Sequence, residues 1–203
     1  MSTPMTLPPT RWELAGEGNR GYGETFAQRV AEGADIDGEA RLADALAPRQ
    51  ARVLDIGSGM GRVAAAMRAR GHRVVATEPD PALCAQSQET YPDLEVLPHQ
   101  ALELDPDELG SFDLVMIVGN VMVFLGEGTE RRVLERMRDL LAPTGRVLVG
   151  FHLTALKAGS RTYPADEFAA DVTAAGLRVV HRFGNNELHE PVDEYAVWVL
   201  ARA

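Results

Sequence analysis

One stretch, residues 52–63, limits the possible folds more than any other part of the chain. It reads R-V-L-D-I-G-S-G-M-G-R-V, a short apolar run followed by glycines at every second position, Gly57, Gly59 and Gly61. Glycine is needed where the backbone turns tightly or approaches a ligand closely. The apolar run indicates a buried parallel strand, and the residues after Gly61 are typical of a helix start. A strand, a glycine-rich turn and a helix start together present free backbone N–H groups to a nucleotide-like ligand.

Strand and helix patterns alternate around this stretch. Such alternation predicts βαβ units, a parallel sheet and right-handed crossovers. The sequence predicts strands at about residues 52–56, 73–77, 95–97, 112–118, 146–151, 177–182 and 194–201. It predicts helices at about residues 22–31, 38–47, 63–70, 129–141 and 164–175, and a further helix that begins after Asp80-Pro81.

The last two predicted strands depart from this rhythm. The segment between them, F-G-N-N-E-L-H-E-P-V-D, is too short and too polar for a crossover helix. The final strand is therefore expected to pair antiparallel with the strand before it. The predicted fold is α/β, with a Rossmann-like, seven-stranded, mostly parallel sheet, an antiparallel last strand, and helices on both faces.

The length of 203 residues favours one domain with a large core. Residues 1–17 carry prolines and little periodicity, so they are expected to form a flexible N-terminal segment. Residues 18–203 are expected to form a single domain, in which the helices of residues 18–50 act as a lid.

Composition excludes several classes of partner. The net charge of −10 and pI near 5.0 disfavour a nucleic-acid partner, whose phosphates need a basic face. No apolar run approaches the roughly 18 residues of a membrane span, and the first residues lack signal-peptide features. The one cysteine, Cys84, fits a reducing compartment, so a cytoplasmic location is expected. With five scattered histidines and no second cysteine, no metal site is predicted. The oligomeric state is not indicated.

Three details narrow the choice of nucleotide. The dinucleotide fingerprint G-x-G-x-x-G fails, because counting from Gly57 places Arg62 at its last glycine. The pattern present is D-x-G-x-G-x-G, which begins at Asp55. An acid, Glu78, closes the second strand roughly 20 residues further on, where a carboxylate can accept both ribose hydroxyls. The antiparallel final strand is also foreign to a six-stranded parallel dehydrogenase sheet.

With these features, the sequence resembles the class I S-adenosylmethionine (SAM) dependent methyltransferases from about Tyr22 to the end. It is similar to small bacterial members of the methyltransferase-domain 25 type, through D-I-G-S-G-M-G-R and Glu78. The stretches G-E-A-R-L-A-D-A-L-A-P-R and G-N-V-M-V-F-L add to the resemblance. The resemblance implies SAM as cofactor and S-adenosylhomocysteine as its product.

The resemblance also implies a set of cofactor contacts. The glycine loop would lie under the methionine part, the second-strand acid would hold the ribose, and residues after the third strand would flank the adenine. Two departures from the family pattern occur, Ser58-Gly59-Met60 for Cys-Gly-Thr and Gln100 for Asp. The cofactor-binding residues expected in this way are Tyr22, Arg29, Asp55, Gly57, Ser58, Gly59, Gly61, Glu78, Pro79, Gln100, Ala101, Gly119, Asn120 and Val121.

Several of these residues have an equally plain structural reading. Tyr22 and Phe26 could close over the cofactor, with Arg29 pairing its carboxylate, or could pack the helix against the sheet. Asn120 is either a residue of the methyl-transfer site or a strand-end cap. His152, at the end of the fifth strand, is the best-placed candidate base, and its alternative is a packing role.

The resulting hypothesis is methyl transfer from SAM to the O, N or C atom of a small-molecule acceptor. The fourth strand ends in G-N-V-M rather than [DN]-P-P-[YFW], which argues against amino methylation of adenine or glutamine of that type. No Pro-Cys nucleophile is present for pyrimidine methylation. A non-catalytic SAM-binding protein and a nicotinamide-dependent oxidoreductase are the alternatives.

Overall fold

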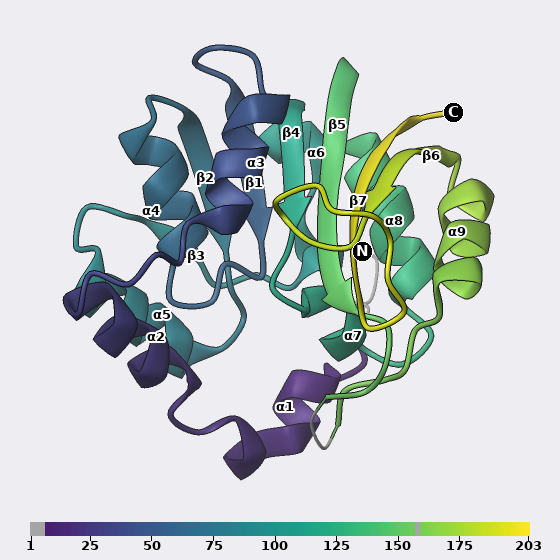
Figure 1. Cartoon of the computed structure of the whole chain (residues 1–203). Helices are drawn as coiled ribbons and strands as arrows, with labels where there is room; N and C mark the ends of the chain where they lie inside the picture. Colours follow the sequence, from purple (N-terminus) through teal and green to yellow (C-terminus); the bar gives the residue numbers. More distant parts are fainter. Residues whose placement is uncertain (1–6, 157–158) are drawn as a thin grey trace, which may run out of the picture.

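A single seven-stranded sheet forms the centre of the protein (Figure 1). The computed structural model describes residues 7–156 and 159–203. The strand order is β3-β2-β1-β4-β5-β7-β6. The pairs among β1 to β5 are parallel, and β7 is antiparallel to both of its neighbours, which confirms the predicted fold and its reversed last strand. The strands are β1 (Arg52–Ile56), β2 (Arg73–Thr77), β3 (Val96–Leu97), β4 (Phe112–Ile117), β5 (Leu141–His152), β6 (Leu177–Phe183) and β7 (Tyr195–Arg202).

The central strands are apolar on both faces because helices cover both. On β4, Val115 and Ile117 point to one face, and Leu114 and Met116 point to the other. The first face is covered by α8 (Glu130–Asp139) and α9 (Ala165–Ala174), and the second by α3 (Gly38–Leu46) and α4 (Arg62–Ala69). Figure 1 shows α3 in front of the sheet, with α8 and α9 beside β6 and β7. This arrangement leaves the carboxyl edge of the parallel strands open to loops.

The start of β5 differs from the sequence prediction. The strand begins at Leu141 instead of residue 146, because Leu141 already pairs with Phe112 of β4. The pairing then shifts register before Leu114 meets Arg146. Residues Pro143, Thr144 and Gly145 thus lie within β5, at an irregularity near its beginning.

The segment before residue 18, which is predicted to be flexible, contains regular structure. Residues 1–6 lie outside the described part, but α1 (Arg11–Ala15) and a 3₁₀ turn, η1 (Gly16–Asn19), follow. Thr10 and Glu13 form a capping box at the start of α1, in which the Thr10 Oγ1 accepts the Glu13 N–H. This mutual capping explains how so short a helix starts. Figure 1 shows α1 beside α7 (Val121–Phe124), the turn that follows β4.

The remaining helices connect the strands. They are α2 (Tyr22–Ala31), α5 (Pro81–Thr90), η2 (Ala101–Glu103) and α6 (Pro106–Leu109). The predicted cap of α5 is confirmed, since Asp80 accepts the N–H of Ala82. Among the described residues, no helix has both the length and the apolar character that a bilayer crossing requires.

Candidate active site

A cavity lies where the glycine loop meets the carboxyl ends of β2 and β4. It encloses about 1330 Å³ of empty space, counting the part that opens to solvent. Loops of the sheet edge form one side, and the segment before α1, α1 itself and α7 contribute the other. Residues of both sides line one continuous space.

The three glycines of the loop serve different purposes. All three have positive φ, at 68°, 59° and 85°. A Cβ on Gly57 would lie 2.7 Å from both methyl groups of Val121, and one on Gly61 would lie 2.5 Å from the Ser87 hydroxyl. A Cβ on Gly59 would meet nothing within 4 Å. Gly57 and Gly61 are therefore required by packing, whereas Gly59 faces open space in the cavity.

Glu78 is fixed by backbone donors at the end of β2. Its Oε2 accepts the N–H of Gly59 at 3.0 Å, and its Oε1 accepts the N–H of Asp80 at 2.9 Å. Burial raises the pKa of this carboxyl to about 7, against the lowering effect of these two hydrogen bonds. A carboxylate can accept about four hydrogen bonds, so Glu78 retains acceptor capacity toward the cavity that it lines.

Asp55 is the second buried acid of the cavity. It is 1% exposed, and its Oδ2 has no hydrogen-bond partner among the described residues. Burial raises its pKa to about 7; the Arg62 guanidinium acts in the opposite direction, and Glu39 and Glu78 add to the rise. A buried, unsatisfied carboxylate oxygen is costly, so this position favours a cationic or hydrogen-bond-donating ligand.

Arg62 also lines the cavity, a position that was not predicted from the sequence. Its guanidinium binds both oxygens of Glu39, at 2.9 and 2.5 Å, and the Ile36 carbonyl at 2.6 Å. It also lies over the ring of Phe26, with Cζ 5.2 Å from the centroid. The residue at which the dinucleotide fingerprint fails therefore ties α4 to α3 and supports the ring of Phe26.

Arg29 does not reach the cavity. It is exposed and lies over Phe26, with Cζ 5.3 Å from the ring centroid. Tyr22 and Arg29 share a helix face, but seven residues of helix separate them by about 10 Å along the axis. Tyr22 lines the cavity, whereas Arg29 lies beyond its rim. The expected pairing of Arg29 with the cofactor carboxylate therefore stays a prediction, made at a position outside the cavity lining.

The two candidate catalytic residues bind each other. The Oδ1 of Asn120 accepts the backbone N–H of His152 at 2.8 Å and lies 3.0 Å from His152 Nδ1. Because that amide atom accepts a backbone N–H, it is the oxygen, so Nδ1 carries the ring proton. Burial lowers the pKa of His152, which keeps the ring neutral. Asn120 lines the cavity, whereas His152 lies behind it with its ring edge-to-face against Tyr195.

Most of the expected cofactor residues come together around the cavity. The exceptions are Arg29 and Gly61, which packs against α5. Those that line the cavity are Tyr22, Asp55, Gly57, Ser58, Gly59, Glu78, Pro79, Gln100, Ala101, Gly119, Asn120 and Val121.

The segment Pro8–Ala15, here called the N-terminal strap, closes the cavity on its outer side. The indole N–H of Trp12 donates to Asp80 Oδ2 at 2.6 Å. The Trp12 ring makes T-shaped contacts with Tyr22 and Phe124, each with centroids 5.3 Å apart. Trp12 therefore bridges α2, α7 and the start of α5. The capping pattern Thr10-x-x-Glu13 was the one sequence signal for this helix.

The opposite side of the strap is held by a buried carboxylate. Glu130, at the start of α8, binds Arg11 Nη1 at 3.0 Å and Arg161 Nη1 at 2.8 Å. Arg11 Nη1 also donates to the Leu125 carbonyl at 2.7 Å. The Glu130 knot, defined as Arg11, Glu130 and Arg161, joins the strap to α8 and to the segment after β5.

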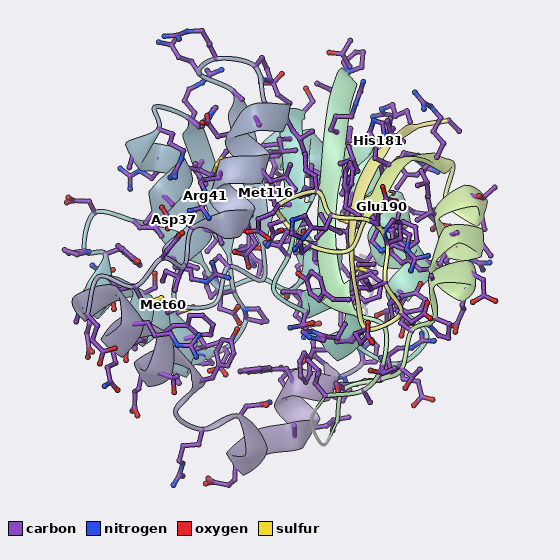
Figure 2. All side chains as sticks on the ribbon, in the orientation of Figure 1. Asp37, Arg41, Met60, Met116, His181 and Glu190 are labelled. Atoms are coloured by element: carbon purple, nitrogen blue, oxygen red, sulfur yellow. The ribbon has the colours of Figure 1, made fainter. Side chains whose placement is uncertain are left out.

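The other histidines lie apart from this arrangement or at its rim. His99 lines the cavity near Gln100, and His189 is held by Asn185. His181 stacks on Phe183 in the edge strand β6, and Figure 2 shows it well apart from Met60 of the glycine loop. Within residues 7–156 and 159–203, no cluster of three or more His, Cys, Asp or Glu side chains is arranged to hold a metal ion.

Comparison with known proteins shows which family the chain resembles. Residues 53–145 match the family model for a methyltransferase domain. The chain is similar to the solved structure of a TehB-like SAM-dependent methyltransferase from Corynebacterium glutamicum, at 32% identity and a TM-score of 0.78, over 91% of this chain and 100% of that one. A comparison with curated protein sequences gives no match.

Two more distant structures share the fold. The CcbJ methyltransferase from Streptomyces caelestis is 19% identical, with a TM-score of 0.71, over 82% of this chain and 88% of that one. The 1,6-didemethyltoxoflavin-N1-methyltransferase of Burkholderia thailandensis is 21% identical, with a TM-score of 0.64, over 100% of this chain and 93% of that one.

The fold, the glycine loop and these matches define an enzyme of the SAM-dependent methyltransferase class. The chain belongs to the class I SAM-dependent methyltransferases, and SAM is its cofactor. The nicotinamide-dependent oxidoreductase alternative therefore does not hold. The residues present fit this cofactor on three counts: the open side of Gly59, the spare acceptor capacity of Glu78, and the unpaired Oδ2 of Asp55.

Proposed function

We propose that the protein transfers a methyl group from SAM to the O, N or C atom of a small-molecule acceptor held in the same cavity. The observation that carries this proposal is the continuity of the cavity, which runs from Glu78 and Gly59 on the sheet edge to Trp12 and Phe124 on the outer side. Bound SAM would supply a methyl group on a sulfonium, which is already activated for displacement. The task left to the protein is to align the two reactants and exclude water.

The residues of the sheet edge have separate roles in this proposal. Glu78 accepts the ribose hydroxyls, and Gln100 and Ala101 flank the adenine. Asp55 meets the positive charge of the methionine part, where its unpaired oxygen is buried. Gly59 allows the close approach of the ligand to the loop backbone.

His152 is proposed to act by positioning rather than as the base. It lies behind the cavity and binds Asn120, whose backbone adopts the left-handed conformation at φ 78°. This contact fixes the turn at the end of β4, where Gly119 and Asn120 line the cavity. A base is required only for acceptors that must lose a proton, and no residue is proposed as a general base.

The ribose assignment is tested by Glu78→Gln. The amide keeps one acceptor oxygen but cannot reproduce the two acceptor sites of a carboxylate, and hydrogen bonds to charged groups contribute about 1.5–3 kcal/mol. We expect the dissociation constant for SAM, measured calorimetrically, to rise at least about 10-fold while the far-UV circular dichroism spectrum is retained. An unchanged dissociation constant would remove Glu78 from the site.

Turnover separates catalysis from mere binding. The protein is incubated with methyl-labelled SAM and a panel of phenols, small amines and carboxylic acids, with the Glu78→Gln variant as matched control. Labelled product that depends on Glu78 supports the proposal. Tight SAM binding without transfer to any member of a broad panel would favour the alternative, a SAM-binding protein without catalysis.

A further inference from the structure

The outer side of the cavity carries information about the acceptor, because it is built from different residues than the sheet edge. We define the outer wall as the lining residues of the strap, of the last position of α7 and of the loops that follow α7 and β5. The outer wall consists of Pro8, Thr10, Trp12, Phe124, Leu125, Gly126, Thr129 and Leu156.

The polar groups of the outer wall are already engaged. The Trp12 indole N–H donates to Asp80, the Thr10 hydroxyl is bound to Glu13, and the Thr129 hydroxyl donates to the Gly126 carbonyl at 2.7 Å. An acceptor that needs many hydrogen bonds would find few partners here. Burial of its polar groups without partners would weaken its binding.

The outer wall also lacks charge within the described residues. The nearest cation on the strap, Arg11, is directed to Glu130 and to the Leu125 carbonyl. The charged groups that line the cavity, Asp55, Arg62 and Glu78, belong to the cofactor side. A charged acceptor would lose its hydration at the outer wall without gaining a counter-ion.

The aromatic groups supply the favourable contacts instead. Trp12 stands nearly perpendicular to both Tyr22 and Phe124, at interplanar angles of 79° and 84°, and forms a corner of three rings. Aromatic rings favour stacked and edge-to-face partners over other apolar groups. The hydrogen bond to Asp80 holds the indole in place, so this corner is formed in advance of binding.

We propose that the methyl acceptor is an uncharged molecule with a flat aromatic or heteroaromatic ring, and that Trp12 is the residue that selects it. This inference rests on the proposed function. It assigns Trp12 to the acceptor and not to the chemistry, so changing Trp12 alters acceptor affinity and leaves cofactor affinity in place.

The test uses quinoline as an uncharged planar probe, cyclohexanol as an uncharged non-planar probe, and glycine as a charged probe. The chain has two tryptophans, so Trp198→Phe leaves Trp12 as the fluorescent reporter, and Trp12→Phe is the matched control. With S-adenosylhomocysteine bound, we expect quinoline to change the Trp12 fluorescence saturably, with a dissociation constant at least 10-fold below those of the other two probes.

Calorimetric titration of quinoline into the unmodified protein, Trp12→Ala and Leu14→Ala repeats the test without a tryptophan reporter. Leu14 lies on the same helix and is 71% exposed. We expect at least a 10-fold loss of quinoline affinity in Trp12→Ala, no loss in Leu14→Ala, and S-adenosylhomocysteine affinity within twofold in all three.

The outcomes distinguish the two proposals. Failure to bind S-adenosylhomocysteine would overturn the proposed function itself. If S-adenosylhomocysteine binds normally, three results would overturn the acceptor inference alone. These are glycine binding as tightly as quinoline, no binding of quinoline, and an unchanged quinoline affinity in Trp12→Ala.

Discussion

When Asp55 is ionised, its buried charge should lower the free energy of unfolding of the ligand-free protein. Its carboxyl is 1% exposed, one oxygen has no partner, and burial raises its pKa from 3.8 to about 7. The unfolded chain loses this proton near pH 4, whereas the folded protein keeps it until about pH 7. The contribution of Asp55 to stability is therefore complete below about pH 4 and is lost as the pH rises to about 7.

The magnitude follows from the two pKa values. Each pKa unit corresponds to about 1.4 kcal/mol. A rise from 3.8 to about 7 thus costs the folded state about 4 kcal/mol at pH 8. Asp55→Asn keeps the shape and removes the charge, so we expect it to raise the free energy of unfolding at pH 8 by up to about 4 kcal/mol, or about 8–16 °C in Tm. Near pH 4 the two proteins should be equally stable.

Urea denaturation at half-unit steps from pH 4 to pH 8.5 measures this difference directly. Asp93→Asn is the control, since Asp93 is exposed and surface changes usually stay within about 0.5 kcal/mol. The pH dependence that remains in Asp55→Asn belongs in part to Glu78, whose pKa is also raised to about 7.

The same substitution should have the opposite effect on the cofactor. In the proposed function an ionised, buried Asp55 meets the positive charge of SAM, so we expect Asp55→Asn to weaken SAM binding at least about 10-fold at pH 8. An Asp55→Asn protein that is no more stable at pH 8, or that binds SAM as before, would refute this account of the buried acid.

Two further predictions concern the scaffold. Gly61→Ala places a Cβ 2.5 Å from the nearest side chain and should lower the free energy of unfolding by at least about 2 kcal/mol, because overpacking costs about 1–3 kcal/mol and the strain of φ 85° adds to it. In Gly59→Ala the Cβ meets no atom within 4 Å, so this variant should lower SAM affinity more than stability. Denaturation measures the stability of both variants, and calorimetry measures their SAM affinity. Tyr163→Phe removes a 2.7 Å hydrogen bond to Asp171 and should cost about 1 kcal/mol in urea denaturation, with SAM affinity unchanged; equal stability would show that this bond contributes nothing net.

Most strands and helices were predictable because the sequence patterns that indicate them are local. The continuous apolar run of β4 and the Asp80-Pro81 start of α5 each depend on a few neighbouring residues. The reversed β7 followed from the segment before it, which is too short and too polar for a crossover helix. The predicted start of β5 was wrong, because the pairing of Leu141 with Phe112 depends on a partner strand that the local sequence does not indicate.

The candidate site was predictable where it follows the sheet edge and not where it depends on distant contacts. Asp55 lies near the end of β1, Gly59 and Glu78 follow β1 and β2, and all three line one cavity. Trp12 binds a residue 68 positions away, and no local pattern indicates that pairing. Arg29 was expected to pair with the cofactor, but it lies outside the cavity lining, since seven residues of helix place it about 10 Å from Tyr22 along the axis.

The Glu130 knot has a consequence for how such a sequence can change over generations. Removing one of two partners of a buried carboxylate leaves its charge only partly compensated, and contacts of this kind are strongly non-additive. Arg11, Glu130 and Arg161 should therefore tolerate replacement together, as an apolar trio, far better than one at a time. Arg11 and Glu130 are sequence neighbours of the outer-wall residues Thr10, Trp12 and Thr129. Changes in acceptor preference are therefore expected at the outer-wall residues, while the three positions of the knot change only together.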